Sequence, residues 1–173
     1  MLRKIINWFK IDKQTIFIII AILSFKSFAY NPSLVPTGSM IPTIDEKSLI
    51  VVNVHSYGIK IPFTKITLID IKEPKRGDIA VFRFPVNEST NYIKRIVGIP
   101  GDTVYFNDKE YFVNKEPEDI TKYQFKTVPA DNYFAIGDNI LHSYDSRFWG
   151  FVPKENLIGE YAFTVLEINK LIK

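Results

Sequence analysis

Short runs of β-branched and aromatic residues recur along most of this chain and restrict it to a mainly β fold. Val, Ile, Phe and Tyr dominate the runs, and turn sequences such as Pro-Gly-Asp, Arg-Gly-Asp and Asn-Asp separate them. Residues of the first kind favour strands, whereas Gly, Pro, Asn and Asp favour turns. Because no long amphipathic helix interrupts the pattern, we expect an open barrel or sandwich of short strands. Strands are expected at 49–54, 78–84, 92–98, 103–106, 111–113, 133–136 and 161–167.

An apolar segment precedes all of these runs. From Gln14 to Tyr30 the only charged residue is Lys26, and a helix of this length is about 25 Å long, at the short end for spanning a bilayer. The first 13 residues hold four basic residues and one acidic residue, whereas the rest of the chain has equal numbers of both. A basic flank before an apolar run is typical of a membrane anchor whose N-terminus stays in the cytoplasm. A single anchor is the favoured interpretation, and a secretory signal cleaved after Ser27-Phe28-Ala29 or a buried soluble helix are alternatives.

These features divide the chain into three parts. Residues 1–13 are expected to be a basic cytoplasmic segment, residues 14–30 a transmembrane anchor, and residues 31–173 a β domain outside the cytoplasm. Within that domain, the polar stretch 114–127 is expected to be an exposed loop or small flap. Nucleic-acid binding is disfavoured because the basic excess precedes the folded domain. The chain has no cysteine and no His/Asp/Glu spacing typical of a metal site, so no thiol catalysis, disulfide, metal or cofactor is expected.

A candidate nucleophile lies in the first of three short blocks. Ser39 follows Gly38, which permits a tight turn, and Pro36 and Pro42 stiffen the chain on both sides. A serine hydroxyl is a poor nucleophile until a base takes its proton. The backbone N–H of Ser39 and the hydroxyl of Thr37 are candidate donors to a developing oxyanion. Alone, such a turn is more often structural than catalytic.

A candidate base lies in the second block, at Lys94 in the strand expected over 92–98. An isolated strand lysine is usually a solvated surface residue, and a catalytic one must be neutral. Lowering its pKa from near 10.4 to roughly 8 requires about 3 kcal/mol of desolvation. Strand alternation places Lys94 with Tyr92 and Ile96 on one face, so Arg95 is expected on the other face, beside an acidic partner.

The third block, at 137–147, contains groups that can support the other two. Ser143 is a candidate to hydrogen-bond the Lys94 amine and orient it. Asp145 and Arg147 are expected to form a salt bridge that fixes the loop. Structural roles in the entry turn are expected for Gly137, Asp138 and Asn139.

In this order and after an apolar segment, the three blocks resemble the type I signal peptidases (leader peptidases), which are membrane-bound Ser/Lys proteases. The resemblance covers about residues 34–165 and is carried by Pro-Thr-Gly-Ser-Met-Ile-Pro-Thr at 36–43, Lys-Arg-Ile-Val-Gly-Ile-Pro-Gly-Asp at 94–102 and Gly-Asp-Asn at 137–139. It implies a catalytic β domain of the signal peptidase type. It also implies that Ser39 is the nucleophile, Lys94 the general base, Thr37 an oxyanion donor and Ser143 the residue that positions the lysine. By the same resemblance, the shallow pockets for small side chains are lined by Val35, Met40, Ile44, Tyr92 and Ile93.

The implied function is removal of N-terminal signal peptides from exported preproteins by a monomeric, single-pass serine endopeptidase of the bacterial inner membrane. The chain departs from the family pattern at Ile140, where Arg is usual, and in having one apolar segment and a short stretch of 35 residues between Asp102 and Asp138. A dedicated conjugative-transfer or pilin-maturation peptidase therefore stays open. A non-catalytic, membrane-anchored β module that binds exported proteins is a further alternative. A Ser-His-Asp triad with His142 is disfavoured because it leaves the sequence around Lys94 unexplained.

Overall fold

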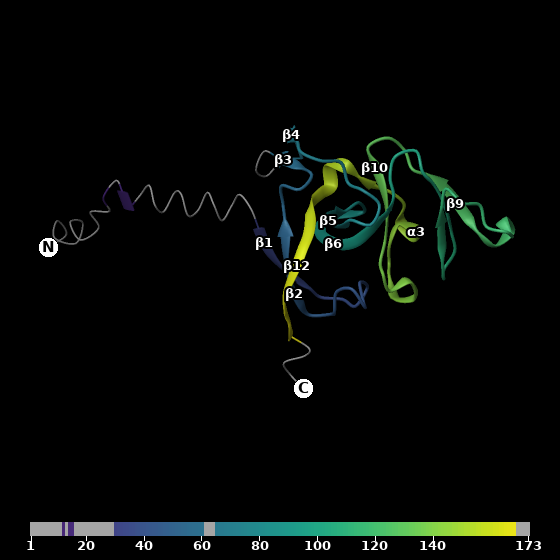
Figure 1. Ribbon diagram of the computed structural model, residues 1–173, viewed down its shortest axis with the longest axis horizontal. Coiled ribbons are helices and arrows are strands. Elements are labelled where there is room, and N and C mark those ends of the chain that lie inside the picture. The colour runs from purple at the N-terminus through teal and green to yellow at the C-terminus, as the bar shows by residue number, and fades with distance from the viewer. Residues whose placement is uncertain (1–11, 13, 16–29, 61–64, 169–173) are drawn as a thin grey trace.

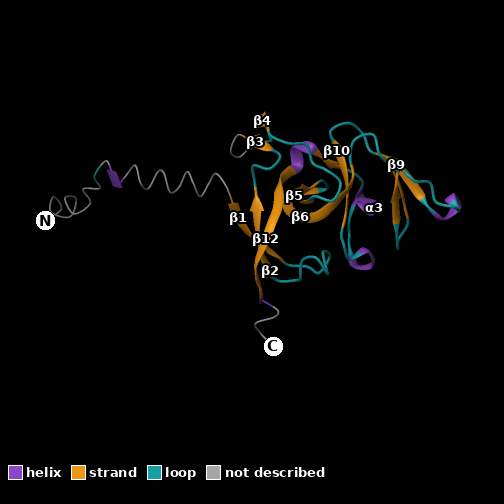
Figure 2. Ribbon diagram, in the orientation of Figure 1, coloured by secondary structure: helices purple, strands orange, loops and turns teal. Residues whose placement is uncertain are grey.

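The computed structural model describes residues 12, 14–15, 30–60 and 65–168. The expected basic segment and membrane anchor lie almost wholly outside these residues. In the part of the chain that is described, no helix is both long and apolar enough to cross a membrane. Strands dominate this part and the helices are short (Figure 2), so the expectation of a mainly β fold is confirmed.

The largest element is a seven-stranded sheet in which every neighbouring pair is antiparallel. Its spatial order is β1-β2-β12-β5-β6-β10-β11, so its two edge strands are β1 and β11. The bounds are β1 Tyr30–Val35, β2 Ser48–Asn53, β12 Leu157–Glu167, β5 Ile79–Phe84, β6 Asn87–Gly98, β10 Asn132–Ile136 and β11 Val152–Pro153.

Two smaller sheets flank the large one. A ribbon of β3 (Gly58–Lys60) and β4 (Thr67–Asp70) follows β2. A three-stranded sheet, in the order β8-β7-β9, lies at the end of the domain farthest from β1 (Figure 1). Its strands are β7 Thr103–Phe106, β8 Tyr111–Val113 and β9 Gln124–Thr127, and the short helices are η2 Ile120–Lys122, η3 Ile140–His142, α3 Ser146–Trp149 and η4 Lys154–Asn156.

All seven strands expected from the sequence are present, and five further strands were missed. Among these, β1 contains Asn31, Pro32 and Ser33, which are poor strand formers. Pro32 is tolerated because β1 is an edge strand that pairs, among the described strands, with β2 alone. The stretch 114–127, expected to be an exposed loop or small flap, ends in β9, whose residues 124–127 pair with β7. Three of the four β9 residues are exposed, which explains why their pattern did not indicate a strand.

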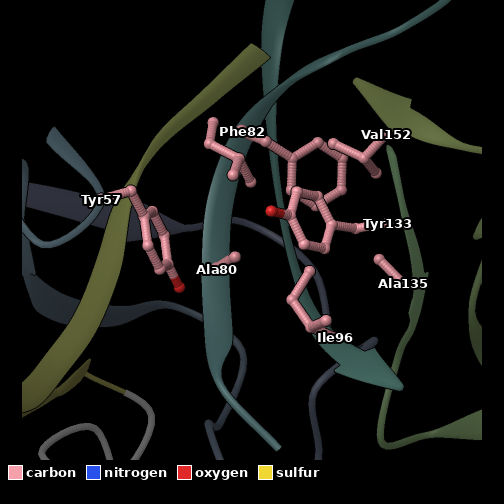
Figure 3. Close-up of a cluster of buried hydrophobic side chains, with 8 residues drawn as sticks. Tyr57, Ala80, Phe82, Ile96, Tyr133, Ala135 and Val152 are labelled. Carbon is pink, nitrogen blue, oxygen red and sulfur yellow. The ribbon is translucent and has the colours of Figure 1, made fainter. Parts of the chain in front are cut away.

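The core consists of three hydrophobic clusters that hold β6 on both faces. In Figure 3, Phe82 of β5, Ile96 of β6 and Tyr133 of β10 point toward one another in the first cluster. Ile93 packs against a second cluster and Val97 belongs to a third. Burial of each large apolar side chain contributes about 1.5–3 kcal/mol. The strand that carries Lys94 is therefore fixed from several sides.

Candidate active site

The turn that carries Ser39 is pinned to the core. It follows β1, and backbone hydrogen bonds from Ile41 N to the Gly38 carbonyl oxygen (3.2 Å) and from Ile44 N to the Met40 carbonyl oxygen (2.9 Å) shape it. Met40 and Ile44 are buried in the second cluster, so the turn is anchored by its own side chains. Ser39 itself is 6% exposed.

The third sequence block clamps this turn. Asn139 donates its backbone N–H to the Ser39 carbonyl oxygen (3.0 Å) and its side-chain amide to the Gly38 carbonyl oxygen (3.1 Å). Gly137 lies so close that a Cβ atom there would overlap Ser143 Oγ and the Ser39 carbonyl oxygen. Only glycine fits at this point, and the 137–147 loop therefore positions the serine.

Lys94 lies directly beside Ser39. Its Nζ atom is 2.6 Å from Ser39 Oγ and 3.0 Å from the Ile93 carbonyl oxygen, and 5.4 Å from the centre of the Tyr92 ring. The side chain is 5% exposed. Burial lowers the pKa of Lys94 to about 8, although the carboxylates of Asp145 and Asp138 oppose this shift. A substantial fraction of the amine is therefore neutral near physiological pH, as a general base requires.

Arg95 points to the opposite face of β6 and forms the ion pair expected for it. Its guanidinium binds Asp138 through two hydrogen bonds, Nε to Oδ1 (2.8 Å) and Nη2 to Oδ2 (2.6 Å), and Thr43 donates its hydroxyl to the same carboxylate. Burial raises the pKa of Asp138, but the hydrogen bonds from Arg95 and Thr43 outweigh this and hold it below its usual range. The carboxylate thus stays charged, and it joins β6 to the third block.

The salt bridge expected between Asp145 and Arg147 is present and buried. Arg147 Nε lies 2.8 Å from Asp145 Oδ1, and Nη2 lies 3.0 Å from Oδ2. The same guanidinium donates to the carbonyl oxygens of Ile140 (2.7 Å) and Ser143 (3.3 Å), while Asp145 accepts the Gly137 N–H (3.2 Å). Arg147 also donates to the Asp108 carbonyl oxygen (2.9 Å), so this one ion pair binds several backbone groups and fixes the loop.

Ser143 is next to this site, but the hydrogen bond expected from it to Lys94 is not formed. The residue is 8% exposed, and its Oγ atom has no hydrogen-bond partner among the described residues. The Oγ atom instead faces the space beside Gly137. A buried hydroxyl without a partner is uncommon and costs free energy, so the group requires an explanation.

A pocket of about 340 Å³ opens over the two reactive groups. Of the residues expected to line it by resemblance, Tyr92 and Ile93 do so, together with Thr37, Ser39 and Lys94. The other three are buried in the second cluster, against which Ile93 packs; they are Val35, Met40 and Ile44.

Among the lining residues that the sequence did not assign to the pocket are His142 and Tyr144. The one signal in the sequence that could have placed them in the pocket was their position on either side of Ser143. His142 is held by Asn139, with Nδ1 3.2 Å from Oδ1. The base that contacts Ser39 in this structure is Lys94.

One edge of β6 is open beside the pocket. On its other edge β6 pairs with β5, including the pairs of Tyr92 with Phe82 and of Ile93 with Val81. β10 pairs only with Arg95, Ile96 and Gly98. Among the described strands none pairs with the remaining edge at Tyr92 and Ile93, and unpaired strand edges are places where an extended peptide can add as a further strand.

Within the described residues, no group of three or more His, Asp or Glu side chains is placed to hold a metal ion.

Comparisons with known proteins identify relatives over nearly the whole chain. A family model described as "Signal peptidase, peptidase S26" matches residues 5–166. The signal peptidase I proteins of Pseudomonas fluorescens and Pseudomonas aeruginosa are each 36% identical to it, over 86% of this chain and 68% of theirs. The signal peptidase I of Rickettsia typhi is 34% identical, over 85% of this chain and 76% of its own. Among solved structures, a signal peptidase I from Enterococcus faecalis V583 covers 54% of this chain and 100% of its own, at 30% identity and a TM-score of 0.44.

Proposed function

The chain belongs to the signal peptidase I family, peptidase S26, and we propose that Ser39 and Lys94 are the nucleophile and general base with which it removes signal peptides from exported proteins. The observation that carries the assignment is the distance of 2.6 Å between Lys94 Nζ and Ser39 Oγ, with both residues buried. A hydroxyl beside a base of lowered pKa is the arrangement that activates a serine.

The reaction proceeds through an acyl-enzyme. Neutral Lys94 accepts the hydroxyl proton while Ser39 Oγ attacks the carbonyl carbon of the scissile bond. The tetrahedral intermediate then collapses, the C–N bond breaks, and the Lys94 ammonium returns its proton to the leaving amine. A water molecule, deprotonated by Lys94, attacks the ester, and the proton returns to Ser39 Oγ as the ester bond breaks.

Donors for the oxyanion come from the nucleophile turn. The backbone N–H of Ser39 and the hydroxyl of Thr37 serve as these donors, and the position of Thr37 in the same pocket supports this. Removal of one such donor typically costs about 3–4 kcal/mol of transition-state stabilisation.

Ser143 positions the lysine. Its buried, unpartnered hydroxyl supports this role, because retaining such a group costs stability unless the working enzyme uses it. The remaining members of the third block hold the site together through the contacts described above.

The exported polypeptide binds as an extended strand along the open edge of β6. Tyr92 and Ile93 contact the residues before the cut, and the buried cluster of Val35, Met40 and Ile44 forms the floor beneath Ile93. A rigid apolar wall of this kind admits small side chains and excludes large ones.

The catalytic β domain, residues 31–173, works outside the cytoplasm of a bacterial cell. Residues 14–30 anchor it as a monomer in the lipid of the plasma membrane, and residues 1–13 remain in the cytoplasm. The basic flank and apolar run support this orientation.

The test is cleavage of a preprotein by the full chain in detergent. Ser39→Ala and Lys94→Met are each expected to abolish cleavage, while Lys115→Met, which removes an exposed lysine, is expected to leave it intact. An acylating inhibitor should label the wild type but not Ser39→Ala. Cleavage that persists in Lys94→Met would exclude the dyad.

A further inference from the structure

Tyr144 is a pocket residue that the mechanism above does not use. It lines the same pocket as Ser39 and Lys94, yet 55% of its surface is exposed. Its ring stacks on Phe148, with ring centres 5.5 Å apart and planes inclined by 24°, and Phe148 is also 55% exposed. Two large exposed aromatic rings side by side are uncommon on a soluble surface unless something binds there.

The orientation of Tyr144 is fixed before any ligand arrives. Phe84 meets it edge to face, with ring centres 6.2 Å apart, and is itself stacked on Tyr92 at 4.4 Å. Tyr92 lines the pocket wall and contacts the Lys94 amine. A continuous set of aromatic contacts thus joins Tyr144 to the strand that carries the base.

The backbone beneath Tyr144 is equally constrained. The buried ion pair of Asp145 and Arg147 follows it directly, and the Arg147 guanidinium lies 5.4 Å from the centre of the Phe148 ring. A ring held in this way loses little conformational entropy when a ligand packs on it. The entropy cost of binding is therefore small, and more of the contact energy contributes to affinity.

We propose that the exposed face of Tyr144 is a specificity site that binds one apolar or aromatic side chain of the exported polypeptide near the cut. The occupant follows from position, because the ring borders the space that the scissile bond must enter. Aromatic contacts and burial of apolar area favour a Phe-like or Leu-like side chain over a polar one. The inference rests on the proposed peptidase function and adds to it a selection for residues other than the small ones.

The experiment uses internally quenched peptides with a small-x-small cleavage sequence. At each position on either side of the cut, one at a time, the peptide carries Phe or Ser. The full chain in detergent is assayed as wild type, Tyr144→Ala, Tyr144→Phe and Phe125→Ala. Phe125 is the matched control, because it is an exposed ring (61%) paired with Tyr105 on the three-stranded sheet, away from the pocket.

At one peptide position, Tyr144→Ala is expected to reduce the preference for Phe over Ser, measured as the ratio of kcat/KM values, by about tenfold. The loss should come from a higher KM for the Phe peptide, while kcat is retained. Tyr144→Phe should keep the preference, since the ring and not the hydroxyl makes the contact. Phe125→Ala should match the wild type. If Tyr144→Ala does not fold, Tyr144→Gln removes the ring while keeping a side chain of similar length, and the same result is expected.

Several outcomes would overturn the proposal. Tyr144→Ala could keep the wild-type preference at every position, or it could slow all peptides equally. If Tyr144→Ala lowers activity in lipid vesicles but not in detergent, the Tyr144 ring contacts the bilayer and not the substrate. Ser39→Ala separates the two proposals: if it abolishes cleavage while Tyr144→Ala changes no preference, only the Tyr144 site is wrong. If Ser39→Ala retains cleavage, or the wild type cleaves no peptide, the proposed function fails and the Tyr144 site fails with it.

Discussion

Lys94 Nζ lies 2.6 Å from Ser39 Oγ, although β6 and β1 are separated in the sheet by β2, β12 and β5. At the usual strand spacing, a flat sheet would place β1 and β6 about 19 Å apart. The turn after β1 and the long side chain of Lys94 must therefore together bridge the strands between them before the hydroxyl and the amine can meet. Their contact is a property of the folded domain as a whole.

The lowered pKa of Lys94 predicts the pH dependence of cleavage. The neutral amine is the active form and burial lowers its pKa to about 8, so kcat/KM should rise with pH and level off above that value. Well below the pKa, activity should fall about tenfold for each pH unit. A pH–rate profile of the detergent-solubilised chain on one peptide tests this. A profile that is flat between pH 6 and 9 would contradict the assignment of Lys94 as the base.

The same burial makes Lys94 a cost to stability. Its pKa falls on folding from 10.5 to about 8, so the unfolded chain binds more protons between these values. The free energy of unfolding should therefore increase as pH rises through this window, and the full penalty applies below it. Lys94→Met should stabilise the protein at pH 7 by up to about 3 kcal/mol and make the rise with pH smaller, leaving the part that Lys60, whose pKa burial also lowers, contributes. Urea unfolding at pH 7 and pH 10 measures both, with Lys115→Met as the surface control.

Ser143→Ala should separate catalysis from folding. The variant removes a buried hydroxyl that has no partner, so the free energy of unfolding should stay the same or increase. If Ser143 positions Lys94, kcat should fall by about tenfold or more. Denaturant melts and steady-state kinetics on the same preparation provide both readouts. An unchanged kcat would limit Ser143 to packing.

Gly137→Ala should damage the site through backbone packing. Its new methyl group would overlap Ser143 Oγ and the Ser39 carbonyl oxygen. Overpacking of this kind costs about 1–3 kcal/mol, and displacement of the serine should abolish most activity. Adding Gly137→Ala to Ser143→Ala should still lower the rate below that of Ser143→Ala alone, because the Ser39 carbonyl oxygen still blocks the methyl group. If the double variant cleaves as fast as Ser143→Ala alone, the overlap with the Ser39 carbonyl oxygen does not affect catalysis.

Arg147→Leu should destabilise the loop strongly. It leaves the buried Asp145 carboxylate unpaired, and breaking a buried ion pair in this way costs about 3–5 kcal/mol. The matched control is Asp119→Asn, which breaks the exposed pair with Lys122 at 2.9 Å and should leave thermal unfolding unchanged. Equal melting temperatures for Arg147→Leu and the control would indicate that the buried pair contributes little.

Much of the fold could be predicted because strand periodicity is local. The run at 92–98 alternates between two faces, and the structure places Tyr92, Ile96 and the buried Lys94 accordingly, with Arg95 on the other side. Strands with few apolar residues were missed, since β1 and β9 depend on a partner strand rather than on their own composition.

The site was predicted less completely. Contacts that join neighbouring residues, such as Asp145 with Arg147, follow from the sequence. The expected hydrogen bond of Ser143 is not formed, because it depends on which way the side chain turns in the packed domain. The burial of Val35, Met40 and Ile44 beneath Ile93 likewise depends on the packed domain. The place of Tyr144 at the pocket rim was not visible in any pattern.

By itself the sequence determined which reactive residue types the chain carries and in which order. It also determined the strand faces on which they lie, because these follow from local alternation and turn preferences. Only the tertiary structure decided that Lys94 is buried and contacts Ser39. Lys94 is buried by β5, where Ala80 pairs with it, and by the nucleophile turn, where Ser39 contacts it. The pKa of an amine responds to such contacts together, and not only to its neighbours in the chain.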